Sequence, residues 1–366
     1  MQTFQCTCKN RPVLFFENTV CIACGRLTGY SEKLHAVVAF TPCDQTDFFL
    51  CDADPDTRYK KCANFHQHSV CNGMLSEAEL ENNPQELCYY CHFNHAIPDL
   101  SISENIALWR KLETAKRRTL YTLQGLSLPI PDRVEDPANG LMFKFLADKS
   151  SEDHFREPLE NQSTVYTGHN AGEITINLSE ADDVARHRTR VSMNERYRTL
   201  LGHFRHEIGH FYWDQLVAEH PDALALFRST FGDEQLDYQQ ALKTHYEKGE
   251  QKDWSQQFIS AYASSHPWED WAETWAHYLH MVDTLETAQH YGVRLDAAEV
   301  NHHQIDSANT DIHQTIEVWT TFTVMFNSLN RSMGLQDAYP FIISDAVSEK
   351  LNTVHRIIRN ATLKAQ

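Results

Sequence analysis

The pentapeptide His206–His210 (His-Glu-Ile-Gly-His) carries two histidines and a glutamate at the spacing of a metal-dependent hydrolase site. On an α-helix, residues four positions apart lie on one face at about 6 Å, so both imidazoles can reach a single ion. Glu207 lies beside that face, where its carboxylate can take a proton from water instead of binding the metal. The sequence therefore predicts a helix that carries two metal ligands and a general base.

A two-histidine zinc site needs a third protein ligand and leaves its fourth position to water. Residues 266–277 supply an acidic and aromatic segment whose helix is predicted to begin at Pro267. Its three tryptophans indicate burial, and buried carboxylates need partners. We predict Glu273 as the third ligand, with Glu269, one turn earlier, as the alternative. If neither carboxylate binds the ion, His203 or another histidine is the next candidate.

Four other side chains near the predicted ligands are candidates for orienting the histidines or for stabilising the charge on a carbonyl oxygen during hydrolysis. They are Asp270, His277, Tyr262 and His266. A packing role is compatible with each of them. The sequence does not identify which one acts on the carbonyl oxygen.

Residues 173–178 alternate apolar and polar side chains, which is the pattern of a half-buried β-strand. We expect this strand to lie at the edge of a small sheet ahead of the metal helix. An extended substrate could add to such an edge through backbone hydrogen bonds.

All ten cysteines lie between Cys6 and Cys91. Closely spaced pairs of cysteines are typical of tetrahedral zinc sites, so the spacing predicts two four-thiolate sites. The first site consists of Cys6, Cys8, Cys21 and Cys24, and the second of Cys62, Cys71, Cys88 and Cys91. Together with the histidine site, we expect three zinc ions per chain, one catalytic and two structural.

Disulfide bonds and inert buried thiols are the alternatives to zinc ligation by these cysteines. In the second set, a nearby histidine could also replace a thiolate; the candidates are His66, His68, His92 and His95. Cys43 and Cys51 belong to neither set, and the sequence assigns them no role.

The abrupt end of the cysteines predicts a boundary between a zinc-ribbon domain over residues 1–98 and a second domain over residues 99–366, which carries the metallopeptidase motif His206–His210. A chain of 366 residues has room for two such domains. The second part is mainly helical by periodicity, with a small β-sheet. We therefore expect an α+β fold, with a ribbon module followed by a zincin-like helical domain.

The formal charge of -18, from 32 basic and 50 acidic residues, repels nucleic acid phosphates and anionic lipid headgroups. No apolar run approaches the ~18 residues of a membrane span, and no secretory signal opens the chain. We expect a cytoplasmic protein that binds neither nucleic acid nor membrane. No motif reports the oligomeric state.

Taken together, these motifs resemble the family of zinc-binding metallopeptidases that carry an N-terminal zinc ribbon. The matching segments are Phe4–Cys8 with Cys21–Gly25, Cys62-Ala63-Asn64, Cys71-Asn72, Cys88–Cys91, Ile97-Pro98-Asp99, the His206–His210 helix and Pro267–His280. The resemblance implies a gluzincin-like peptidase domain with zinc as its cofactor and Glu207 as its base. It implies His206, His210 and Glu273 as the ligands, and no defined substrate.

We expect the protein to hydrolyse peptide bonds of a peptide or protein substrate, with zinc activating water and Glu207 acting as general base. The alternative is a catalytically silent, zinc-stabilised protein-binding module, although a pure scaffold has no need of Glu207. A ribbon-containing nucleic-acid factor is a third class, which the acidic charge disfavours. No motif distinguishes endopeptidase from exopeptidase action.

Overall fold

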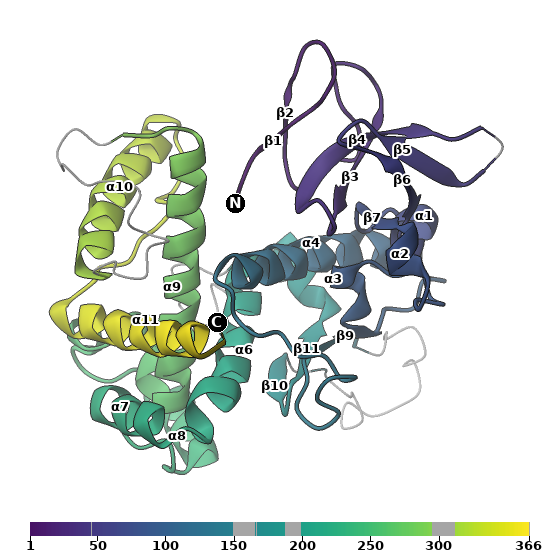
Figure 1. Ribbon diagram of the computed structural model, residues 1–366. Coiled ribbons are helices and arrows are strands. Elements are labelled where there is room, and N and C mark those ends of the chain that lie inside the picture. The colour runs from purple at the N-terminus through teal and green to yellow at the C-terminus, as the bar shows by residue number, and fades with distance from the viewer. Residues whose placement is uncertain (45, 149–164, 166, 187–198, 295–311, 366) are drawn as a thin grey trace, which may run out of the picture.

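The computed structural model describes residues 1–44, 46–148, 165, 167–186, 199–294 and 312–365 (Figure 1). These residues form an α+β fold with an N-terminal zinc-ribbon region followed by a mainly helical region that includes a small sheet. None of the helices described is long and apolar enough to cross a membrane.

The N-terminal region consists of a hairpin, a five-stranded barrel and three short helices. The hairpin pairs β1 (Phe4–Gln5) with β2 (Val13–Leu14). The barrel strands are β3 (Leu27–Ser31), β4 (Ala36–Pro42), β5 (Phe48–Cys51), β6 (Asp54–Lys61) and β7 (Gly73–Ser76). The helices are α1 (Ala63–His68), α2 (Glu77–Leu80) and α3 (Tyr89–His92).

The barrel closes through a parallel pairing of β3 with β7, whereas its other strand pairs are antiparallel. Gly29 lies on β3 at this closure, where a Cβ atom would come within 2.6 Å of the carbonyl oxygen of Asn72. A side chain at this position would push the two strands apart, so the close approach requires glycine.

A second sheet has the order β10-β11-β9-β8. Its strands are β8 (Asn94–Ala96), β9 (Met142–Leu146), β10 (Gly168–Asn170) and β11 (Glu173–Asn177). The strand predicted at residues 173–178 exists as β11, but its predicted edge position is wrong. It lies between β10 and β9, because the preceding Gly168–Asn170 segment folds back onto it as an antiparallel edge strand.

Helices form most of the remaining chain. The α-helices are α4 (Ser103–Gly125), α6 (Leu200–Trp213), α7 (Pro221–Phe231), α8 (Tyr238–Lys248), α9 (Pro267–His290), α10 (Ile312–Ser332) and α11 (Asp345–Ala365). Shorter turns are the 3-10 segments η3 (Leu178–Ala181), η5 (Trp254–Gln256) and η6 (Tyr262–Ser265) and the π-helical η4 (Asp214–Ala218).

Helix α4 lies below the barrel in the view of Figure 1, and it contacts both α3 and α6. Its Trp109, Leu112 and Leu120 are fully buried. The buried apolar side chains of the ribbon region and of the helical region belong to one continuous cluster. The division into two domains at residue 98 stays a prediction, because α4 packs against both regions.

Helices α6 and α9 form the most extensive helix pair and bring residues 206–210 beside residues 267–275. Gly209 permits this approach, because a Cβ atom there would come within 2.9 Å of the Cα atom of Ala272. The indole N–H of Trp271 on α9 donates to the carbonyl oxygen of Gly209 at 2.8 Å. The glycine inside the pentapeptide therefore serves the packing of the two helices.

Candidate metal centres

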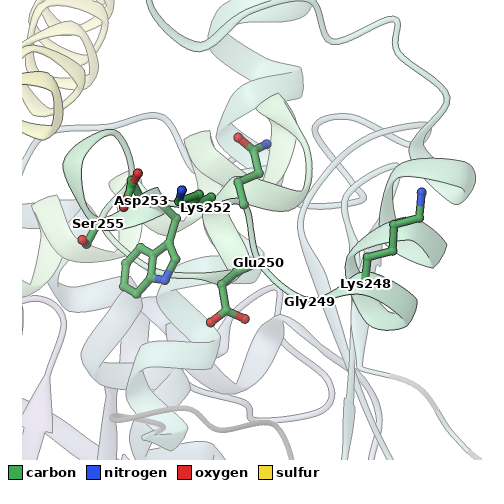
Figure 2. A pocket seen from close by; sticks show the side chains of 8 residues that line it. Lys248, Gly249, Glu250, Lys252, Asp253 and Ser255 are labelled. Carbon is green, nitrogen blue, oxygen red and sulfur yellow. The ribbon is translucent and has the colours of Figure 1, made fainter.

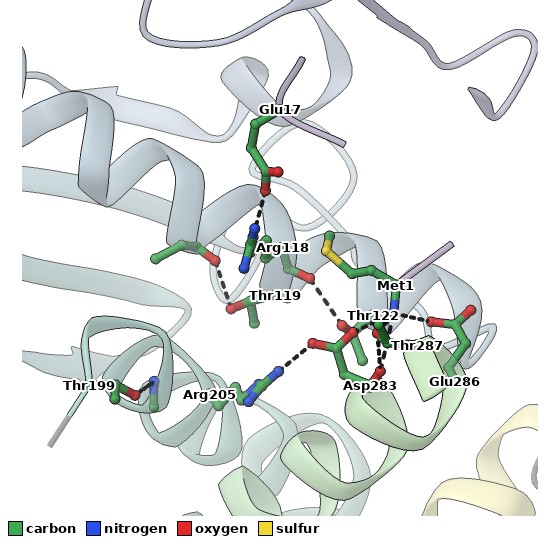
Figure 3. Close-up of polar contacts among 12 residues, drawn as sticks. Met1, Glu17, Arg118, Thr119, Thr122, Thr199, Arg205, Asp283, Glu286 and Thr287 are labelled. Carbon is green, nitrogen blue, oxygen red and sulfur yellow. Dashed lines mark hydrogen bonds and ion pairs between the residues drawn. The ribbon is translucent and has the colours of Figure 1, made fainter. Parts of the chain in front are cut away.

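Helix α6 carries the two predicted histidines and is held by a cap at its N-terminus and by a contact with α9. Thr199 caps its N-terminus by accepting the N–H of Gly202 at 3.0 Å. Arg205 donates to Asp283 Oδ2 on α9 at 2.6 Å, and the amino group of Met1 donates to Asp283 Oδ1 at 2.8 Å (Figure 3). Arg205, the residue directly before His206, is therefore hydrogen-bonded to α9.

Three ligand atoms converge between α6 and α9. The Nε2 atoms of His206 and His210 are 3.2 Å apart. Glu269 Oε2 lies 3.0 Å from the first and 3.5 Å from the second. The side chains of His210 and Glu269 are buried, and that of His206 is 11% exposed. The structure thus brings both predicted histidines together with Glu269, the alternative considered for the third ligand.

This arrangement fits a bound cation. A carboxylate oxygen facing two imidazole nitrogens can be held by protons or by a metal ion, and Glu269 Oε2 has no hydrogen-bond donor among the residues described. Two imidazoles and one carboxylate are a known donor set for catalytic zinc, which keeps a fourth position open. The donor chemistry and the burial therefore both suit zinc.

Glu273 occupies a different place from the one predicted. Its Oε1 atom accepts a hydrogen bond from His206 Nδ1 at 2.7 Å, on the ring edge opposite the converging atoms. Its Oε2 atom accepts from the hydroxyl of Ser260 at 2.6 Å. The geometry therefore makes Glu273 the partner that orients His206, because each turn of α9 carries its carboxylate to a different side of the imidazole.

The pKa values follow from these contacts. Burial alone would lower the pKa of His206, but the carboxylates of Glu269 and Glu273, 3.0 and 2.7 Å from its ring nitrogens, raise it well above its ordinary value. Burial alone would raise the pKa of Glu273, yet the hydrogen bond from His206 lowers it to about 2. Burial also opposes ionisation of Glu269, whose pKa is nonetheless held well below normal by His210 and His206. Both carboxylates are thus ionised near neutral pH.

Two of the remaining predicted residues, Asp270 and His277, contact segments outside the histidine centre. Asp270 Oδ2 lies 2.7 Å from Lys350 Nζ of α11. His277 Nδ1 is hydrogen-bonded to the Tyr339 hydroxyl at 2.8 Å. Neither side chain is one of the three converging groups, because Asp270 is directed to Lys350 and His277 to Tyr339. The sequence did not show that these two segments pack beside α9.

His266, Tyr262 and His203 have separate environments. His266 caps α9 by accepting the N–H of Trp268, and its Nε2 atom donates to the Leu236 carbonyl. Tyr262 packs beside the centre, with its ring centroid 6.0 Å from that of His206. His203 Nδ1 lies 3.3 Å from Glu180 Oε2 and is not among the converging groups. Of these three side chains, Tyr262 is thus the one whose ring packs against a converging histidine.

Tyr238 is a residue at the centre that sequence reasoning missed. Its hydroxyl donates to Glu269 Oε1 at 2.6 Å. Burial, followed by the charge of Glu269, raises the pKa of Tyr238 above its ordinary value, so the hydroxyl keeps its proton. No local pattern marks this tyrosine, because the contact joins the start of α8 to α9 across 31 residues.

Two rings complete the surroundings of His210. The Trp268 ring lies 3.8 Å from that of His210, and the His169 ring is stacked at 6.4 Å. His169 is on the edge strand β10, and its Nε2 atom accepts the N–H of Gly172 at 3.0 Å. Burial lowers the pKa of His169 to about 3, so this imidazole is neutral. The edge strand thus lies directly beside the histidine centre.

The first cysteine cluster forms as predicted from spacing: the sulfur atoms of Cys6, Cys8, Cys21 and Cys24 all lie within 4.8 Å of one another. Cys21 and Cys6 are buried, whereas Cys24 is exposed. The N–H groups of the Arg26 backbone and side chain lower the pKa of the Cys24 thiol to about 6. Four thiolates at this separation suit one tetrahedral ion.

The second cluster, formed by Cys62, Cys71, Cys88 and Cys91, also has its sulfur atoms within 4.8 Å of one another. All four residues are buried. Cys62 and Cys88 are the residues directly before α1 and α3, and the backbone N–H of Cys88 donates to the Cys62 sulfur at 3.3 Å. The set therefore also suits a tetrahedral ion, without a histidine among its four members.

Helix α4 supplies a buried cation to this second cluster. The Arg117 side chain is fully buried and lies within electrostatic reach of Cys71, Cys88 and Cys91. The guanidinium donates to Asn72 Oδ1 and stands over the Phe16 ring at 4.7 Å. A residue outside the cysteine-rich region therefore offsets the charge of its thiolates.

Cys43 and Cys51 lie outside both clusters. Cys51 is buried, and its sulfur accepts the N–H of Ala53 at 3.3 Å. His92 hydrogen-bonds Asp132 instead of a cysteine set.

An open hollow after α8 is lined by Lys248–Ser255 and contains none of the candidate ligands (Figure 2).

Comparisons with known proteins identify the family of the chain. A family model described as "Putative zinc-binding metallo-peptidase" matches residues 105–357, and a zinc-ribbon domain model matches residues 3–102. Uncharacterized proteins of Mycobacterium bovis and Mycobacterium tuberculosis are each 38% identical over 359 residues, which is 98% of this chain and 95% of theirs. No solved structure matches the chain significantly.

Proposed function

The chain belongs to this metallo-peptidase family, and from that premise we propose that it hydrolyses peptide bonds at a zinc centre held by His206, His210 and Glu269. The observation that carries the proposal is the convergence of two imidazole Nε2 atoms and one carboxylate oxygen in a buried space between α6 and α9. The two thiolate clusters would hold two further, structural zinc ions.

Zinc, when bound, lowers the pKa of a water molecule toward ~7 and polarises a carbonyl group. Glu207 follows His206 on α6, is 8% exposed, and does not belong to the ligand set. Its carboxylate is free to take a proton from the attacking water and to pass it to the leaving amine. Glu273 holds the His206 ring in orientation through Nδ1.

Tyr262 supports the same reaction as the candidate donor to the developing oxyanion. Burial and the charges of Glu269 and Glu207 raise the pKa of its phenol well above the ordinary value, so it carries a proton at neutral pH. Its position beside His206 makes it a better candidate than His266 or His277, whose imidazoles are hydrogen-bonded to Leu236 and Tyr339.

The experiment compares hydrolysis of a mixed peptide library by the full-length zinc-loaded protein and by Glu207→Gln. Loss of the base should lower the rate by about 10² to 10⁴-fold, while the zinc content stays unchanged. The control is Glu317→Gln on α10, whose side chain is exposed. Full activity of Glu207→Gln would remove this residue from the mechanism. Absence of chelator-sensitive hydrolysis by the unmodified protein would favour the non-catalytic binding module.

A further inference from the structure

The two oxygens of the Glu269 carboxylate have different partners. Oε2 faces the Nε2 atoms of His206 and His210, whereas Oε1 accepts the hydroxyl proton of Tyr238 at 2.6 Å. The carboxylate is 1% exposed, so water does not compete for Oε1. One oxygen is thus directed to the metal position and the other is held by a protein donor.

Tyr238 is itself held by the helix that carries Glu269. Its ring packs edge-on against His266 at 5.2 Å and against Trp268 at 5.6 Å, and both residues belong to the start of α9. At its own end, Asp237 caps α8 by accepting the N–H of Gln240 at 3.0 Å. The Tyr238 ring is therefore held against the first turn of α9. Its hydroxyl can form the hydrogen bond to Glu269 with little further loss of side-chain conformational entropy.

A carboxylate can bind an ion through one oxygen or through both. With one oxygen, two histidines and one carboxylate leave a zinc position open, whereas a second carboxylate oxygen would compete for that position. A donor that occupies Oε1 opposes the two-oxygen mode. It also restricts rotation of the carboxylate, as partners of metal ligands do in general.

We propose that Tyr238 is a positioning residue whose hydroxyl holds Glu269 Oε1, so that Glu269 binds zinc through Oε2 alone and one zinc position stays open for reaction. The inference rests on the proposed function only for the identity of the three ligands. It concerns coordination, so it is measurable without any peptidase substrate.

The test is Tyr238→Phe in the full-length protein, because phenylalanine keeps the ring contacts with His266 and Trp268 and removes only the hydroxyl. Zinc affinity of the histidine centre, measured by chelator competition, should fall by about 10 to 100-fold, while the thiolate clusters keep their zinc. Cobalt bound at the histidine centre should change from the intense visible spectrum of four-coordination to the weaker spectrum of five-coordination. Tyr246→Phe, which removes a hydroxyl from the same helix, is the matched control.

The outcomes separate the possible explanations. Wild-type affinity and an unchanged cobalt spectrum in Tyr238→Phe would overturn the proposal. Loss of metal from all three centres, or a lower melting temperature than in Tyr246→Phe, would show a structural role instead and also overturn it. The proposed function fails separately, if the unmodified protein hydrolyses no peptide while the cobalt spectrum still responds to Tyr238→Phe. Retention of the metal by Glu269→Ala would refute the ligand set on which both rest.

Discussion

The thiolate clusters and the histidine centre differ in how many ligands they offer and in where those ligands come from. Each cluster has four cysteines, which is enough to close a tetrahedral site. The histidine centre brings three candidate ligand atoms together, one fewer than a closed tetrahedral site needs. Under the proposed function, zinc would thus stabilise one part of the chain and act as a catalyst in another, depending on the number of protein ligands.

The two kinds of site also differ in the distance that the fold has to bridge. In the second cluster, Cys88 and Cys91 come from one short turn and its helix. At the histidine centre, His206 and Glu269 lie on separate helices, α6 and α9, and meet only because those helices cross closely at Gly209. The geometry of the histidine centre thus depends on the packing of α6 against α9, which a substitution outside the three converging residues can perturb.

The largest effect is expected from breaking the second thiolate cluster. Cys88→Ser should remove its zinc, and structural zinc sites contribute on the order of 10 kcal/mol to folding. Because this cluster belongs to the continuous core, thermal unfolding followed by circular dichroism should show loss of the cooperative transition of the whole chain. A Cys88→Ser protein with an unchanged melting temperature would contradict a structural role for the cluster.

The next effect concerns the third ligand of the histidine centre. Glu269→Ala deletes a direct metal bond, so it should empty this centre and abolish hydrolysis while both thiolate clusters keep their zinc. Zinc content by atomic absorption should fall by one ion per chain relative to the unmodified protein. If Glu269→Ala kept all three zinc ions, Glu269 would not be a ligand, and the contrast between the four-ligand clusters and a three-ligand histidine centre would be wrong.

A smaller effect tests the buried cation of the second cluster. Arg117→Met should lower the free energy of unfolding by about 3 to 5 kcal/mol, because it leaves buried thiolate charge without its partner. The neighbouring Arg118→Met is the control, since its ion pair with Glu17 is partly exposed and should contribute at most about 1 kcal/mol. Urea unfolding of the zinc-loaded proteins measures both. Equal effects of the two substitutions would show that Arg117 does not offset thiolate charge.

The smallest effect distinguishes Glu273 from Glu269. Glu273→Ala frees the His206 ring but deletes no bond between Glu269 and the ion, so zinc affinity of the histidine centre should fall only ~10 to 100-fold. Chelator competition on the full-length protein measures this loss. If Glu273→Ala emptied the centre while Glu269→Ala kept its ion, the two roles would be exchanged and Glu273 would be the ligand.

Local spacing was sufficient for much of the chemistry. The turn of a helix fixes the distance between His206 and His210, and short loops fix the distance between paired cysteines such as Cys21 and Cys24. These features depend on residues close in sequence, so the amino-acid sequence alone was enough to predict the pentapeptide helix and both thiolate clusters. The α+β fold class followed from the same local patterns.

Only the tertiary structure decided which carboxylate lies beside the Nε2 atoms of both histidines. Glu269 and Glu273 lie one turn apart on α9, and the crossing of α9 with α6 places the first on the Nε2 side of His206 and the second on the Nδ1 side. The contact of Tyr238 with Glu269 was equally hidden in the sequence. The physical reason is that helix periodicity fixes positions within one helix, whereas the relative placement of two helices depends on side-chain packing along their whole interface.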